Sequence, residues 1–470
     1  MAPRSQNSVV EGILVETSGI ERPFTVTKTM PHSLIVSFEQ SKEPNDASAF
    51  ANCRISLGDK SLELGAGEYH KHPALPRRRK DDPPPEPGHG RLVFSENIWK
   101  FSSLRHTGRV TSLQQRVQQL PLLWKRKELV CAPFRQYTLE LLYDLQVYRA
   151  QFDSVDRGLA RETEAVRERV SQTIVDTQYG AFSKFLDRKL DELALVTRHF
   201  DRYEHECHGF FFRKQLWDII LSAAFMARTN LKPRGYAGDS TMMDMIYKNA
   251  FIGSSSFARF MHYHPLQHPG SCAVRNRRKI VVERMREMSA GRDKPLRIIS
   301  IACGPARELL DLFAEPEDLD RYHLVLLDQD PEAIAEAKES TNAVQEKLGR
   351  APTIEFIHGS VRTLSQALAK CQVEKADFLY TMGLFDYLTP PVARSVLGQL
   401  ATLLQPNGSI LLGNFHPENP SRTYMEYWLD WVLFYRNEED LISLTRGLPV
   451  RESRVFLEPD KAQLFMEMKL

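Results

Sequence analysis

The sequence predicts an α/β protein in which a doubly wound, mostly parallel sheet follows a helical region and a small N-terminal β-barrel. Three regions of the 470 residues differ in sequence pattern, and these patterns support the prediction. Short β-rich runs between turn residues fill residues 8–110, apolar residues at helical spacing fill 111–290, and β-rich runs alternate with helical segments over 291–470. We therefore expect three domains with these boundaries.

The composition is typical of a soluble globular protein. Apolar residues make up 42% of the chain and charged residues 26%. The net charge of +2 is too balanced to indicate nucleic-acid binding. The six cysteines contain no C-x-x-C pair, so we expect reduced thiols and no metal site. The N-terminus lacks a signal-peptide pattern and the longest apolar run, 216–227, is too short to cross a bilayer, which favours a cytoplasmic protein.

The first region contains six β-rich runs that predict a small antiparallel barrel or sandwich: EGILVETS, FTVTKTM, SLIVSFEQ, CRISLGD, SLELGAG and RLVFSEN. A segment rich in proline and charge, about residues 73–90, interrupts them. Because this segment has almost no large apolar side chains to bury, we expect it to be a disordered insert.

These runs resemble a PilZ domain, a small barrel that often binds cyclic di-GMP. Binding members carry an R-x-x-x-R segment and then a D/N-x-S-x-x-G strand. Here no R-x-x-x-R precedes a strand, and the spacing of Asp59, Ser61 and Gly65 is one residue too long. The resemblance therefore implies a degenerate or interaction module with weak or absent cyclic di-GMP binding.

The second region predicts a helical connector and substrate lid. The segment 211–230, FFRKQLWDIILSAAFMARTN, predicts one strongly apolar helix. The basic run at 275–279 predicts one face of a helix, with Arg275 or Arg278 turned inward. Gly235 and Gly238, close to aromatic residues, are typical of a lid over a site.

The third region contains five β-rich runs separated by helical segments: LRIISIA, HLVLLD, TIEFIHG, DFLYTM and SILLGNF. Such alternation predicts a parallel, doubly wound sheet. Two further runs, RVFLEPD and AQLFMEMKL, have a short connection and predict an antiparallel hairpin at the sheet edge.

The first strand of that sheet leads into a turn of small residues that opens a helix. Ala302, Gly304 and Ala306 let the backbone bend sharply and approach a ligand. Asp328 ends the second strand, 24 residues after Gly304, close to the spacing at which an acidic residue meets a ribose hydroxyl. Asp330 is better suited to cap the next helix. Together these residues indicate a ligand that contains adenosine.

The turn distinguishes between two such ligands, the dinucleotide NAD, which contains a pyrophosphate, and S-adenosylmethionine. Pro305 and Ala306 crowd the place of a pyrophosphate, whereas S-adenosylmethionine (SAM) has no phosphate. The residues thus resemble Rossmann-like class I SAM-dependent methyltransferases. That resemblance implies a methionine-facing turn, a ribose-binding acid and an adenine contact after the third strand, and the expected cofactor-binding residues are Ala302, Cys303, Gly304, Asp328, Gln329, Ser360, Val361 and Met382.

Residues 234–240, RGYAGDS, and YWLDW at 427–431 extend the resemblance over roughly residues 175–470. They look like the bacterial synthases of 3-hydroxy fatty acid methyl esters, such as that of 3-hydroxypalmitate, a family that makes quorum signals. The resemblance implies that SAM methylates a small acyl carboxylate. The residues expected to act on it are Tyr236 beside the sulfonium, Asp386 and Tyr387 after the fourth strand, and Arg436 or Arg234 on the carboxylate.

Other activities stay open at this point. A carboxylate acceptor needs no general base, whereas a hydroxyl or amine would, and only Asp386, Tyr387 and His416 lie where a base is needed. Another small molecule or a protein side chain is therefore an alternative acceptor. Ser300 and Ser360 stand where the family usually has acids, which keeps a non-catalytic regulatory module as a further alternative.

Overall fold

The computed structural model forms two compact units, Met1–Arg126 and Lys127–Leu470, which we describe separately. The described residues are 10–30, 33–38, 43–57, 60–71, 89–94, 117–118, 120–360 and 373–470. The expected disordered insert lies outside them, except for its last two residues, which begin a strand.

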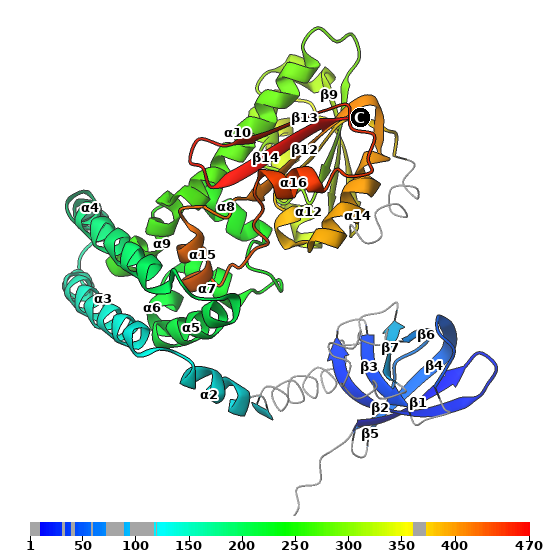
Figure 1. The fold of residues 1–470 in the computed structure, drawn as a ribbon, viewed down its shortest axis with the longest axis horizontal. Helices are drawn as coiled ribbons and strands as arrows, with labels where there is room; N and C mark the ends of the chain where they lie inside the picture. The colour runs from blue at the N-terminus through cyan, green and yellow to red at the C-terminus, as the bar shows by residue number, and fades with distance from the viewer. Residues whose placement is uncertain are drawn as a thin grey trace, which may run out of the picture. The chain divides into compact units, whose positions relative to one another are not determined.

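The first unit is a closed antiparallel barrel of six strands, with a seventh as a short hairpin partner (Figure 1). The strands follow one another around the barrel as β1 (Val10–Glu16), β2 (Glu21–Met30), β3 (Ser33–Phe38), β7 (His89–Phe94), β6 (Gly67–Lys71) and β4 (Ser48–Leu57), and β5 (Lys60–Glu63) pairs with β4. The ring closes because β4 also pairs with β1. Leu34, Val36 and Phe38 alternate along β3 and fill the interior. The predicted small barrel is confirmed.

The second unit begins with a helical region: α3 (Ala132–Gly158), α4 (Glu164–Thr197), α5 (Arg202–Gln215), α6 (Trp217–Ser222), α7 (Ala224–Leu231), α8 (Ser240–Lys248), α9 (Ser256–Gln267) and α10 (Pro269–Ser289). A shorter helix, α2 (Leu120–Glu128), precedes it. Within the described ranges no helix combines the length and apolar character needed to cross a membrane.

The single helix predicted for residues 211–230 is wrong, because the chain forms the end of α5, then α6 and α7. Ala223 is extended, with φ −102° and ψ 122°, and separates α6 from α7. The N–H of Phe225 donates to the ring of His262 in α9, at 3.2 Å, instead of to a carbonyl in its own helix. A tertiary hydrogen bond thus replaces the local one that a continuous helix would make.

The unit ends in a seven-stranded sheet with the order β10-β9-β8-β11-β12-β14-β13. Its strands are β8 (Leu296–Ile301), β9 (Tyr322–Asp328), β10 (Thr353–His358), β11 (Ala376–Thr381), β12 (Leu404–Phe415), β13 (Glu452–Leu457) and β14 (Gln463–Lys469). The first five are parallel, and β14 runs antiparallel between β12 and β13. The predicted hairpin exists, with only β13 at the edge.

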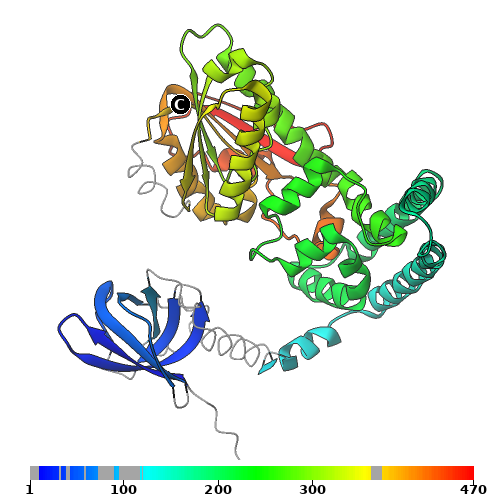
Figure 2. The ribbon, with the colours of Figure 1, turned by 180° about the vertical axis from the view of Figure 1, so that it is seen from behind.

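Both faces of the sheet are covered, as the apolar strand sequences require. Ile298 packs with α10, α11 (Leu309–Leu312) and α12 (Pro331–Leu348). Its neighbour Ile299 packs on the opposite face with α14 (Pro390–Ala401) and α16 (Glu438–Ser443). The two views from opposite sides show these layers (Figures 1 and 2). Since β9 and β11 leave β8 on opposite sides, the carboxyl ends of β8 and β11 border a crevice of the kind that binds ligands.

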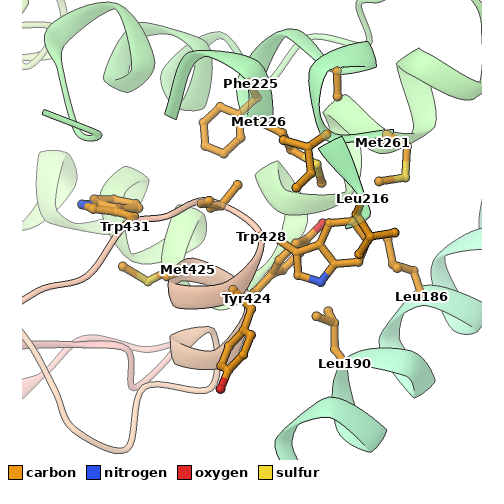
Figure 3. Close-up of a cluster of buried hydrophobic side chains, with 14 of the residues drawn as sticks. Leu186, Leu190, Leu216, Phe225, Met226, Met261, Tyr424, Met425, Trp428 and Trp431 are labelled. Atoms are coloured by element: carbon orange, nitrogen blue, oxygen red, sulfur yellow. The ribbon is translucent and has the colours of Figure 1, made fainter. Parts of the chain in front are cut away.

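A second core joins the helical region to the segment that follows β12. Trp428 lies at its centre, fully buried, with its ring 5.1 Å from that of Phe212 and edge-on to it. Figure 3 shows Leu186 and Leu190 of α4 around the same indole, with Tyr424 of α15 (Arg422–Tyr427) nearby. The helices are therefore one folded unit with the sheet, and they can supply walls to its crevice.

We predict that Trp428→Ala lowers the free energy of unfolding by about 3–5 kcal/mol, because it leaves a large cavity in this core. Urea denaturation of the full chain, followed by circular dichroism, measures the change. Val432→Ala is the matched control, since Val432 is 59% exposed in the same segment and its truncation should change stability by less than about 0.5 kcal/mol. Equal losses in the two variants would contradict the proposed core.

Candidate active site

A cavity of about 600 Å³ lies at the carboxyl ends of β8 to β12. The sheet side consists of the segments that follow these strands, and α8, α10 and the loop 232–239 close the other side. The following site residues predicted from the sequence line it: Arg234, Tyr236, Ala302, Cys303, Gly304, Asp328, Gln329, Ser360, Met382, Asp386 and Tyr387. Val361 lies outside the described residues, and Arg436 is not part of the lining.

The turn after β8 is strained. Ala302, Gly304 and Ala306 have φ values of 55°, 56° and 48°, in the left-handed region. A residue with a Cβ is disfavoured there by roughly 1–2 kcal/mol, so the two alanines hold this shape at a cost. Strain of this kind collects at ligand sites, where the surrounding structure maintains it.

Asp328 stabilises that turn. Its carboxylate accepts the N–H of Gly304 at 2.9 Å and the N–H of Asp330 at 2.9 Å, one on each oxygen. The side chain is only 7% exposed, and burial raises its pKa while the two N–H donors oppose that rise. The two oxygens together have about four lone-pair positions, more than these backbone donors occupy. The residue can therefore hold the turn and still accept hydrogen bonds from a diol.

The loop 232–239 is held over the cavity by ion pairs. Arg234 contacts three carboxylates of the α12 start, Asp330 at 3.0 Å, Glu332 at 2.7 Å and Glu336 at 2.8 Å. Arg307 pairs with Asp244 of α8 at 2.8 Å. Because Arg234 already has three acidic partners, it acts as the anchor of the loop and not as a group that is free for a substrate carboxylate.

Three aromatic side chains meet beneath this loop. Trp431 donates its indole N–H to the hydroxyl of Tyr387 at 2.8 Å, and the ring of Tyr236 stands edge-on to that of Tyr387 at 6.3 Å. A Cβ on Gly238 would lie 2.4 Å from the Tyr387 oxygen, so only glycine permits this approach. Burial raises the pKa of both tyrosines, which keeps their hydroxyls neutral.

Asp386 lies in the short helix η4 (Phe385–Tyr387), almost completely buried. Its carboxyl accepts the N–H of Phe415 at 2.8 Å. Burial raises the pKa of Asp386 to about 7, although the charges of Arg277 and Arg436 oppose the rise. The group is thus poised to gain or lose a proton near neutral pH.

Arg436 holds η4 in place by hydrogen bonds and does not line the cavity. Its guanidinium donates to the carbonyls of Phe385 at 2.7 Å and Leu388 at 2.5 Å and to the side chain of Asn414 at 2.6 Å. These partners occupy it away from the cavity. The arrangement favours a positioning role for Arg436 over the direct acceptor contact expected from the sequence.

Two lining residues were missed by the sequence analysis. Arg277 faces the cavity from α10, next to Arg278, for which an inward orientation was expected and which also lines the cavity. The signal was present, since Val274, Arg277 and Val281 follow one another at helical spacing on the buried face. Glu308 is buried beside the turn and accepts the hydroxyl of Tyr380 at 2.7 Å, and burial raises its pKa. No local pattern pointed to it, because Tyr380 comes from a distant strand.

Comparison with known proteins decides the class of this site. A family model described as a methyltransferase domain matches residues 298–408, from β8 to β12. This segment matches a methyltransferase domain, and the predicted enzyme class, a methyltransferase, is confirmed for it. No curated protein matches the sequence.

The methyltransferase is also similar to solved structures. Magnesium protoporphyrin IX methyltransferase from Synechocystis PCC 6803, with bound S-adenosylhomocysteine (SAH), is 14% identical over 49% of this chain and 94% of its own, with a TM-score of 0.35. N-methyltransferase NodS from Bradyrhizobium japonicum WM9, in complex with SAH, is 17% identical over 43% of this chain and 88% of its own, with a TM-score of 0.30.

We predict that Asp328→Ala weakens SAH binding at least about tenfold, because charged hydrogen bonds to the ligand and the support of the turn are lost together. Isothermal titration calorimetry of the full chain measures the Kd for SAH. Asp328→Asn should show an intermediate loss, since it keeps one acceptor oxygen. Asp320→Ala removes an exposed carboxylate that pairs with Arg350 and should bind SAH normally. Normal SAH binding by Asp328→Ala would contradict the assignment.

Proposed function

We propose that this methyltransferase transfers the methyl group of SAM to the carboxylate of a small acid, with a 3-hydroxy fatty acid as the leading acceptor and its methyl ester as the product. One observation carries the proposal: the end of the cavity near β11 combines a buried cation, Arg277, with a mainly apolar and aromatic wall. The wall consists of Tyr236, Met243, Leu388, Phe415 and Trp431. The volume lies within the range of small-molecule sites. The resemblance to quorum-signal synthases supports the same acceptor.

The cofactor is proposed to lie across the strand ends. The strained turn Ala302–Gly304 faces the methionine part, and Asp328 with Gln329 binds the ribose. Ser360 is proposed to lie near the adenine and Met382 to border the methyl group, while Val361, also expected near the adenine from the sequence, lies outside the described residues. The fit is supported by the free lone pairs of Asp328 and by a turn crowded at Pro305, which suits a ligand without phosphate.

Methyl transfer is an in-line displacement, and bound SAM supplies the activated methyl group. The protein's own task is to position the acceptor and to exclude water. Tyr236, Tyr387 and Trp431 form the wall that shields the reacting end, and the ion pairs of Arg234 keep the loop closed over it. Arg436 fixes η4, so that Asp386 and Tyr387 keep their places.

A second candidate function is methylation of a hydroxyl group on a small molecule. Asp386 supports it, because a buried carboxyl whose pKa is about 7 can take a proton from such an acceptor. A carboxylate acceptor needs no such base.

The N-terminal barrel is proposed to be a degenerate PilZ-like interaction module. Its closed antiparallel ring supports the likeness. Weak or absent cyclic di-GMP binding is expected, because the binding motifs noted in the sequence are incomplete. Asp59, part of the residual motif, lies outside the described residues.

The proposal is tested by incubating the full chain with SAM and 3-hydroxy fatty acids of increasing chain length. We expect mass spectrometry to find the methyl ester, and mild alkali to release methanol from it. The corresponding fatty amides are matched controls and should give no product. Methylation of the amides equal to that of the acids would contradict ester formation.

The pH dependence of Asp386→Asn separates the two functions. With a hydroxyl acceptor, the wild-type rate should rise as the pH passes about 7, because Asp386 becomes ionised and can accept a proton. Asparagine should abolish that rise and lower the rate about a hundredfold. With a carboxylate acceptor, the rate should stay nearly level between neutral and mildly alkaline pH in both proteins. Steady-state rates across this range, with each acceptor class, measure the difference.

A further inference from the structure

Arg277 is the buried cation at the β11 end of the cavity, with only 8% of its surface exposed. One terminal nitrogen donates to the carbonyl of Met382 at 3.2 Å, and the other approaches the sulfur of Met243 at 3.0 Å. Its Nε–H is buried without a partner among the described residues. Only two of the five N–H donors of the guanidinium are therefore used, and the acceptors are a neutral carbonyl and a weakly accepting thioether.

The other arginines that line the cavity are different. Arg278, the next residue of α10, forms a two-point ion pair with Asp311, at 2.5 and 2.7 Å. Arg234 contacts three carboxylates. Arg277, by contrast, forms no ion pair within 4.0 Å in the described part of the chain. A buried guanidinium without a counter-ion is costly, so a charge that arrives with a ligand would stabilise it.

Three acids line the cavity together with Arg277, namely Glu308, Asp328 and Asp386. None of them forms an ion pair with it within 4.0 Å in the part of the chain that the structure describes. Burial raises the pKa of Glu308 and of Asp386, while the charge of Arg277 opposes both rises. The guanidinium thus interacts with these acids only at a distance, and it has no ion-pair partner among the described residues.

We propose that Arg277 is the carboxylate-binding residue of this cavity. Each terminal nitrogen keeps one N–H without a partner among the described residues, and a carboxylate in the cavity can accept from these donors. The contact of Arg277 with Met382 and its closeness to Gly383, whose Cβ would lie 3.5 Å away, put that carboxylate beside the end of β11. Asp386 and Tyr387 belong to the same end of the cavity.

Two carboxylates can reach this position, that of the acceptor and that of the methionine part of the cofactor. Binding of the acceptor carboxylate by Arg277 rests on the proposed function, whereas binding of the cofactor carboxylate requires only that SAM binds. A direct measurement of SAH binding therefore tests the second alternative even if no acid is methylated.

The test compares wild type with Arg277→Met, which has a similar length and no charge. Calorimetry measures binding of SAH and of its decarboxylated analogue, S-adenosyl-3-thiopropylamine, and methyl-transfer kinetics measure the KM for 3-hydroxypalmitate. If the cofactor carboxylate is held, the variant loses about 30-fold in affinity for SAH and almost none for the analogue. If the acceptor carboxylate is held, SAH binds normally and the KM rises about 30-fold.

Unchanged SAH affinity together with an unchanged KM overturns the proposal, as does an equal loss for SAH and its analogue. A structural role is separated by thermal unfolding without ligand. Removal of an uncompensated buried charge should leave Tm unchanged or raise it, whereas loss of a structural arginine would lower it. Arg286→Met is the matched control, since Arg286 is exposed on the same helix outside the cavity lining and should leave binding and KM unchanged.

Discussion

The carboxylate of Asp328 joins the elements that meet at the edge of the sheet. It accepts the N–H of Gly304 from the turn after β8 and the N–H of Asp330 at the start of α12. Asp330 in turn caps α12 and pairs with Arg234 of the loop over the cavity. A continuous set of polar contacts thus runs from the strained turn to the lid. Loss of this acid would disturb both walls of the site and not only one ligand contact.

The two walls have different origins. The sheet provides the turn, Asp328 and the strand ends. Ligands of proteins with open α/β sheets generally bind at these places. The loop 232–239, α8, α10 and Trp431 come from segments outside the matched methyltransferase domain. The sheet thus provides the side of the cavity that we propose to bind the cofactor, while Arg277 and Trp431 come from segments that the family model does not cover.

The sequence predicted what depends on local pattern. The seven C-terminal β-rich runs became β8 to β14. Five of them were recognisable as parallel strands because such strands, covered on both faces, need apolar stretches. The turn after β8 was singled out by its small residues, and the structure places it at the cavity. Arg436 was harder to interpret, because only the fold shows that carbonyls from η4 occupy its guanidinium. Arg277 was missed because the sequence does not show which of the three neighbouring arginines points inward. The buried Val274 and Val281 define the inward face of the helix, and Arg277 lies on that face.

The position of β14 has a consequence for biosynthesis. This strand lies between β12 and β13, yet it is the last of the three to leave the ribosome. Until then, β12 has one unpaired edge along the apolar stretch that ends at Phe415. Exposed edges of this kind pair readily with other chains. The nascent protein is thus open to edge-to-edge pairing until β14 has left the ribosome, and a chaperone that shields β12 in that interval would increase the yield of folded protein.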